Sequence, residues 1–180
     1  MRADKNSPGY FLLMVLIILV ANLARAQDET LAEIKYKEDY DRLQKIAAIT
    51  NPSKRADLLV KFYREKPDLE PRLKQYADSL FLTDLDALMK QQNFIAIRGL
   101  TERVLQIRPK FGEAYFFHAV ALKNDKKIEE AMQSLARCYV IKNPYQKRAK
   151  QLLDVTYRDY NKGSMVGLEK IINQANQAMK

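Results

Sequence analysis

Residues with catalytic or metal-binding chemistry are sparse in this chain of 180 residues. His118 is the only histidine and Cys138 is the only cysteine. A zinc or iron site would therefore have to be built from carboxylates, and no disulfide can form within the chain. The sequence predicts neither a bound metal nor a cofactor.

The spacing around His118 and Cys138 favours packing over catalysis. His118 shares one helix face with Tyr115 and Leu122, which predicts a hydrogen-bonded packing residue. Cys138 lies close to Leu135 along the chain. A nucleophilic thiol needs a lowered pKa and solvent access, so we expect this thiol to be buried and inert.

Two other patterns could suggest an active site. Asp84 and Asp86 are two residues apart, and on a helix such residues point in different directions, which argues against an acid–base pair. A phosphate-binding loop would need clustered glycines, but those within the chain are isolated. Outside residues 1–26 they are Gly99, Gly112, Gly163 and Gly167. We therefore expect a protein that is not an enzyme.

The composition favours helices. The chain is 47% hydrophobic and 29% charged, with only 5 Gly and 6 Pro. Frequent Ala, Leu, Lys, Glu and Gln are typical of helical proteins rather than of disordered or all-β chains. We predict an all-α fold.

Residues 1–26 have the layout of a secretory signal peptide. Basic Arg2 and Lys5 precede an apolar stretch, and Ala24-Arg25-Ala26 follows it. The apolar core is shorter than the roughly 20 residues of a membrane-spanning helix, which favours cleavage before Gln27 and export. The alternative is an uncleaved segment that anchors the protein to a membrane through residues 10–24.

Two capping signals and an apolar stripe predict three helices in the first half. The Thr30-Leu31-Ala32-Glu33 capping box opens one that runs to about Ile49. Asn51-Pro52 opens a second, which ends at Glu65, and a third covers about 70–91.

The second half repeats with an interval of 34 residues. Phe81 and Tyr115 begin matching series. The first continues with Asp84, Leu85, Leu88, Ile97, Thr101, Val104 and Pro109. The second continues with His118, Ala119, Leu122, Ala131, Leu135 and Cys138. A third copy, with a longer turn at 161–163, runs through Ala149, Leu152, Leu153, Thr156, Leu168, Ile172 and Ala175.

This pattern resembles the tetratricopeptide repeat (TPR), although Asp84 and His118 stand where that repeat usually has Leu. The resemblance covers residues 78–176. It implies seven or eight helices, as helix-turn-helix hairpins stacked in a short right-handed superhelix. The expected parts are a signal peptide (1–26), an N-terminal helical hairpin region (27–77), and repeats at about 78–111, 112–145 and 146–180.

Residues 51–67 are also similar to helical hairpins of bacterial envelope proteins, such as the outer-membrane assembly and Tol-Pal accessory families. This similarity implies an exported protein of the bacterial periplasm or a secreted one. In such proteins the repeats hold other proteins. We therefore expect a noncatalytic interaction scaffold or adaptor.

The net charge of +9 comes mainly from the second half of the chain. Residues 27–91 hold 12 basic and 13 acidic residues, whereas residues 92–180 hold 16 and 8. In TPR proteins the first helices of successive repeats line a concave groove, so the resemblance implies a groove that is apolar in the middle and basic at one side. It would bind an acidic or amphipathic segment of another protein. Its expected lining residues are Phe116, Val120, Lys123, Asn124, Lys147, Lys150 and Arg158.

Two other interpretations of these residues remain open. The charged side chains could form an ordinary solvated face, with Phe116 and Val120 packed against the N-terminal helices. The protein could instead bind nucleic acid or another polyanion through clustered bases and aromatic rings, although the export signal and the interspersed acids weigh against this. Those residues are Lys142, Lys147, Arg148, Lys150, Tyr139, Tyr145 and Tyr157.

Overall fold

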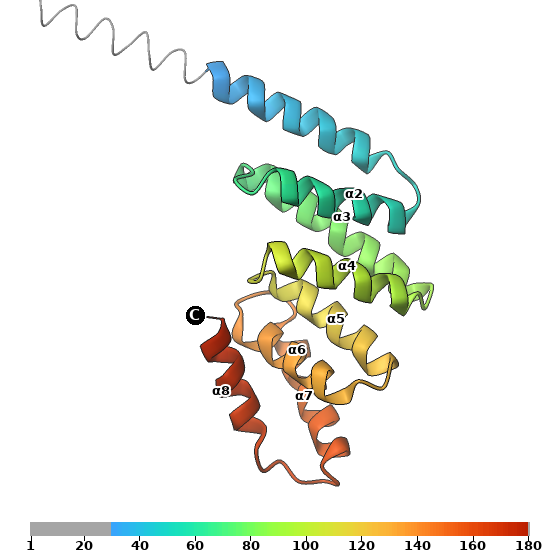
Figure 1. Cartoon of the computed structure of the whole chain (residues 1–180), viewed down its shortest axis with the longest axis vertical. Helices are drawn as coiled ribbons and strands as arrows, with labels where there is room; N and C mark the ends of the chain where they lie inside the picture. Colours follow the sequence, from blue (N-terminus) through green and yellow to red (C-terminus); the bar gives the residue numbers. More distant parts are fainter. Residues whose placement is uncertain (1–29, 180) are drawn as a thin grey trace, which may run out of the picture. The chain divides into compact units, whose positions relative to one another are not determined.

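The computed structural model describes residues 30–179, and the chain divides into two units, Met1–Gln44 and Lys45–Lys180. All regular structure in residues 30–179 is helical (Figure 1), so the prediction of an all-α fold is confirmed. The predicted signal peptide, residues 1–26, lies outside the described residues. Between residues 30 and 179, no helix has both the length and the apolar composition needed to cross a membrane.

A helix covers residues 30–47, as the capping box predicts. Seven more follow within residues 45–179. They are α2 (Pro52–Glu65), α3 (Pro71–Lys90), α4 (Phe94–Ile107), α5 (Gly112–Asn124), α6 (Ile128–Val140), α7 (Gln146–Tyr160) and α8 (Leu168–Ala178).

Helices α2 and α3 both begin at side-chain caps, of which the sequence analysis predicts the one at Asn51. The Asn51 side chain accepts a hydrogen bond of 2.9 Å from the backbone N–H of Lys54. Glu70 accepts bonds of 2.8 and 3.1 Å from the N–H groups of Arg72 and Leu73. Each helix has Pro in its first turn, where the missing N–H costs no intrahelical bond.

Consecutive helices pack against one another in most cases. Helix α2 lies on α3, α4 on α5, α5 on α6 and α6 on α7, and α2 also contacts α4. Helix α8 departs from simple hairpin order, because it packs mainly on α6 (Figure 1). The turn between α7 and α8 bends through Lys162, Gly163 and Gly167, all with positive φ, and the Tyr157 hydroxyl bonds the carbonyl of Val166 within it.

Aromatic side chains fill much of the core. Phe62, Phe81, Phe116 and Phe117 are all less than 2% exposed. The Phe81 ring lies 6.0 Å from that of Phe111 and the Phe116 ring 5.8 Å from that of Phe117, which are distances typical of favourable aromatic pairs.

Gly112, the first residue of α5, lies directly against the turn between α6 and α7. A Cβ atom there would approach Asn143 Nδ2 to 2.5 Å. That amide cannot move freely, because it donates 2.7 Å bonds to the carbonyls of Cys138 and Ile141, while Asn143 Oδ1 accepts from the N–H of Tyr145.

We expect Gly112→Ala to lower the free energy of unfolding by about 2 kcal/mol, because the added methyl group displaces an amide that holds three hydrogen bonds. Urea unfolding followed by circular dichroism measures the change. Gly99→Ala is the control, since its Cβ would meet nothing within 4 Å. Equal stability of the Gly112 variant and the wild type would contradict this account of the turn.

Candidate functional site

The single cysteine lies in the core, as predicted. Cys138 is fully buried on α6, and burial raises the pKa of its thiol to about 12. At neutral pH it is therefore a protonated thiol without the thiolate character of a nucleophile. Among residues 30–179, no three His, Cys, Asp or Glu side chains gather in a way that could hold a metal ion.

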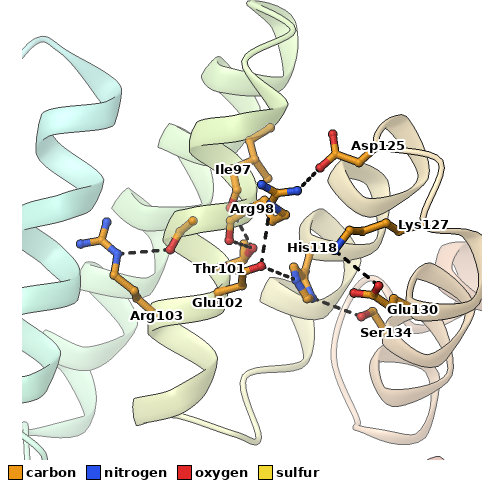
Figure 2. A network of polar contacts seen from close by, with 11 residues as sticks. Ile97, Arg98, Thr101, Glu102, Arg103, His118, Asp125, Lys127, Glu130 and Ser134 are labelled. Carbon is orange, nitrogen blue, oxygen red and sulfur yellow. Dashed lines mark hydrogen bonds and ion pairs between the residues drawn. The ribbon is translucent and has the colours of Figure 1, made fainter.

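His118 joins three helices, as Figure 2 shows. Its Nδ1 lies 3.2 Å from Ser134 Oγ on α6, and its Nε2 lies 3.8 Å from Glu102 Oε1 on α4. Nearby, Arg98 on α4 donates to Asp125 at the end of α5. His118 is thus hydrogen-bonded through Nδ1, as predicted, whereas its buried Nε2 has no hydrogen-bond partner among the described residues.

Burial lowers the pKa of His118 from its ordinary value of 6.5, and the carboxylate of Glu102 opposes this shift only in part. The unfolded chain thus binds a proton more readily than the folded one. Stability is therefore complete above the unfolded pKa and decreases as the pH falls below it. We expect the free energy of unfolding to decline as the pH falls below 6.5, and less so in His118→Gln.

Urea titrations at several pH values test this prediction. Parallel pH profiles for the wild type and His118→Gln would show that other groups cause the decline.

Asp84 and Asp86 face different surroundings, as their spacing predicts. Asp84 is fully buried and paired with Arg55 of α2, whose Nη2 lies 2.6 Å from Asp84 Oδ1. Arg55 Nη1 also donates to the carbonyl of Ile49 at 3.0 Å. Asp86 is half-buried on another face of α3. The two carboxylates do not form a catalytic pair.

Phe116 does not offer its ring to a partner, which corrects its expected role as an exposed anchor. The side chain is 1% exposed. The ring of Tyr145 lies 5.0 Å from it, and the guanidinium of Arg148 covers it at 4.8 Å. The partners of Phe116 thus come from α5, α7 and the turn before α7, and Phe116 belongs to the core.

The other expected residues of α5 also have local surroundings. Lys123 Nζ donates to Thr156 Oγ1 of α7 at 3.3 Å. Val120 is half-buried, and Asn124, the last residue of α5, is exposed.

The expected bases of α7 do not extend the α5 surface. Lys150 binds both carboxylate oxygens of Asp154 at 2.7 Å, and its Nζ lies 5.8 Å from the ring centre of Tyr139 on α6. Lys147 and Arg158 are exposed and make no ion pair with the described residues. Of the seven expected residues, Phe116 thus lies in the core, and Lys123 and Lys150 have partners within the protein.

The exposed bases belong instead to a stripe along the outer side of α7. Lys147, Gln151, Val155 and Arg158 are all exposed and follow one another at steps of four, four and three residues. Val155 is 51% exposed. We call this stripe the α7 face. The steps of three and four residues between these positions are visible in the sequence. The residue types at Gln151 and Val155, however, do not by themselves indicate a binding surface.

A second surface was missed by the sequence analysis. A groove of about 620 Å³ runs along α3 and reaches the first turn of α5. We call it the α3 groove. Its walls include Gln75, Asp78, Ser79, Leu82, Asp86 and Glu113. In the sequence, the groove positions on α3 recur at steps of three or four residues, on the side of the helix opposite the apolar stripe. This recurrence could have indicated the groove.

The aromatic residues considered for nucleic-acid stacking have other contacts. Tyr157 is buried, Tyr145 packs on Phe116 and Phe117, and the Tyr139 ring lies beneath Lys150. They do not form a row of exposed rings.

A comparison with protein-family models, curated proteins and solved structures finds no significant match.

Proposed function

We propose that the protein is a noncatalytic interaction scaffold of the bacterial cell envelope, built from TPR-like hairpins. It is exported by the segment 1–26 and binds an acidic or amphipathic segment of another protein. The α5–α6 hairpin, which falls within residues 112–145, supports the repeat interpretation.

The α7 face carries this proposal. Lys147 and Arg158 are separated by 11 positions, or roughly 16 Å along the helix axis, with the apolar Val155 between them. An acidic amphipathic helix could place carboxylates at both ends of this stripe and an apolar side chain on Val155. Lys150 and Asp154 are half-exposed beside the stripe and pair with each other. The net charge of the stripe therefore comes from Lys147 and Arg158.

The experiment is a pull-down from an extract of the cell envelope, with mass spectrometry of the captured proteins. The wild type is compared with Lys147→Glu/Arg158→Glu. The matched control is Lys162→Glu/Lys170→Glu, which makes the same change of charge at two other exposed lysines. We expect a protein that the wild type and the control capture and the α7 variant loses. Identical capture by all three would refute the role of the α7 face.

A polyanion column and N-terminal sequencing address the alternatives. Tight retention that falls steeply with salt would favour nucleic acid or another polyanion over a protein partner. Gln27 at the mature N-terminus would support cleavage, whereas Met1 would support the membrane anchor through residues 10–24.

A further inference from the structure

The α3 groove follows one side of α3 over several turns. Its α3 wall presents Gln75, Ser79, Leu82 and Asp86 at steps of four, three and four residues, which places them on one side of the helix. The opposite side of α3 holds buried residues such as Phe81 and Leu85. Glu113, in the first turn of α5, also lines the groove, and both Glu113 and Asp86 lie close enough to Tyr145 to act on its hydroxyl electrostatically.

Two carboxylates in this groove lack a partner. Asp86 and Glu113 are half-buried, yet neither makes a hydrogen bond or ion pair with the described residues. Every other buried or half-buried carboxylate between residues 45 and 179 has one. These are Asp57, Glu70, Asp78, Asp84, Asp125 and Asp154.

Asp78, a carboxylate in the same groove, does have hydrogen-bond partners. It accepts a hydrogen bond of 2.8 Å from the Tyr63 hydroxyl and another of 2.8 Å from Arg108 Nη2. The carboxylates of the groove without a partner are therefore Asp86 and Glu113, whereas its one basic residue, the exposed Lys74, lies one turn of α3 before Asp78. A partly desolvated carboxylate gains most from a cation that reaches it from outside.

Tyr145 lies at the same end. Burial raises the pKa of its hydroxyl, and the nearby charges of Asp86 and Glu113 raise it further, while the guanidinium of Arg148 opposes them. The hydroxyl is thus held neutral beside two carboxylates, and its ring adds an aromatic surface that a cation can approach.

We propose that the α3 groove binds a segment of a partner protein in extended conformation, with a Lys or Arg side chain between Asp86 and Glu113. Charge complementarity identifies this occupant. A metal ion is a poor fit, because among the described residues no three His, Cys, Asp or Glu side chains come together here to hold one.

The groove also indicates the spacing of the segment. Leu82 lies four residues before Asp86, or about 6 Å along the helix. In an extended chain, residues two apart point the same way and are separated by roughly 6.6 Å. The occupant therefore carries an apolar side chain two residues from its basic one. This site is separate from the α7 face, so each proposal can fail without the other.

The test uses synthetic peptides and the full chain. One peptide of about nine residues, blocked at both ends, carries Leu and Lys alternately at every second position, with Ser between them. The matched peptide replaces each Lys with acetyl-lysine, which removes only the charge. Fluorescence anisotropy measures both affinities at low and at physiological salt.

Two variants are compared with the wild type. Asp86→Asn/Glu113→Gln removes the groove charges with little change in shape. Asp159→Asn/Glu169→Gln removes the same number of charges from exposed positions on α7 and α8. We expect the groove variant to bind the Lys peptide about tenfold more weakly than the wild type, and the control variant to bind it almost as tightly.

Three results would overturn the proposal. The first is absence of binding of the Lys peptide to the wild type, or equal binding of the acetyl-lysine peptide. The second is an equal loss of affinity in both variants, which would assign the effect to net charge. The third is self-association of the wild type that the groove variant abolishes, since the occupant would then be a second copy of this chain. Circular dichroism verifies that both variants are folded.

Discussion

Asp84→Ala is expected to lower the free energy of unfolding by about 3 to 5 kcal/mol. Asp84 is fully buried, and Arg55 donates to it through Nε and Nη2 at 2.6 to 3.0 Å. Burial raises the pKa of the carboxyl, while the guanidinium opposes that shift. Removal of Asp84 leaves a guanidinium that is only 17% exposed without its counter-ion, which is the costly way to break such a pair.

A double variant separates this pair from ordinary packing. In Arg55→Leu/Asp84→Leu both charges are gone, and an apolar pair of similar volume is often neutral in stability. Arg55 also donates to the carbonyls of Ala47 and Ile49, so these bonds are lost at about 1 kcal/mol each. We therefore expect the double variant to be more stable than Asp84→Ala.

Urea unfolding provides the measurement for all these variants. Lys127→Gln is a control, because its pair with Glu130 is exposed and such pairs contribute less than about 1 kcal/mol. If Asp84→Ala is as mild as Lys127→Gln, the pair does not hold α2 against α3.

Helix positions could be predicted because their signals are local. The cap at Asn51 satisfies a free N–H group three residues away, so the sequence alone locates the start of α2, while the apolar stripe of α3 locates that helix approximately. His118 and Cys138 could be assigned to packing for a related reason, since helical periodicity places each beside apolar neighbours.

The Arg55–Asp84 pair shows where local signals end. Asp84 was recognised as a departure from the usual Leu of the repeat, but its partner lies 29 residues earlier on another helix. Nothing in the spacing along one helix identifies such a partner. A buried acid at a position expected to be apolar indicates only that some base must reach it.

The candidate site was predicted less well, because the residues on one face of a helix do not indicate which other part of the chain covers that face. Phe116 was correctly placed on the side of α5 away from Leu122. Tyr145, just before α7, and Arg148, in the first turn of α7, cover that side. Charge totals hid the α3 groove in the same way, since residues 27–91 are nearly neutral although Asp86 lies unpaired on one surface of α3.

Phe116→Ala is expected to lower the free energy of unfolding by about 3 to 5 kcal/mol, with no direct contribution to partner binding. The ring is 1% exposed, and its removal leaves a cavity against Phe117 and Tyr145. Arg148 also loses the aromatic face over which it lies at 4.8 Å, and with it a cation–π contact. Phe116→Leu should lose less, because the larger side chain fills part of the cavity.

Val155→Ala is the matched test on the α7 face. Val155 is 51% exposed, so its truncation should change stability by less than about 0.5 kcal/mol while weakening capture of the partner. The two variants thus separate a core residue from a surface residue in the same two measurements, urea unfolding and pull-down. If Phe116→Ala kept full stability and lost the partner, the ring would be an anchor after all, and Arg148 would have to move aside when the partner binds.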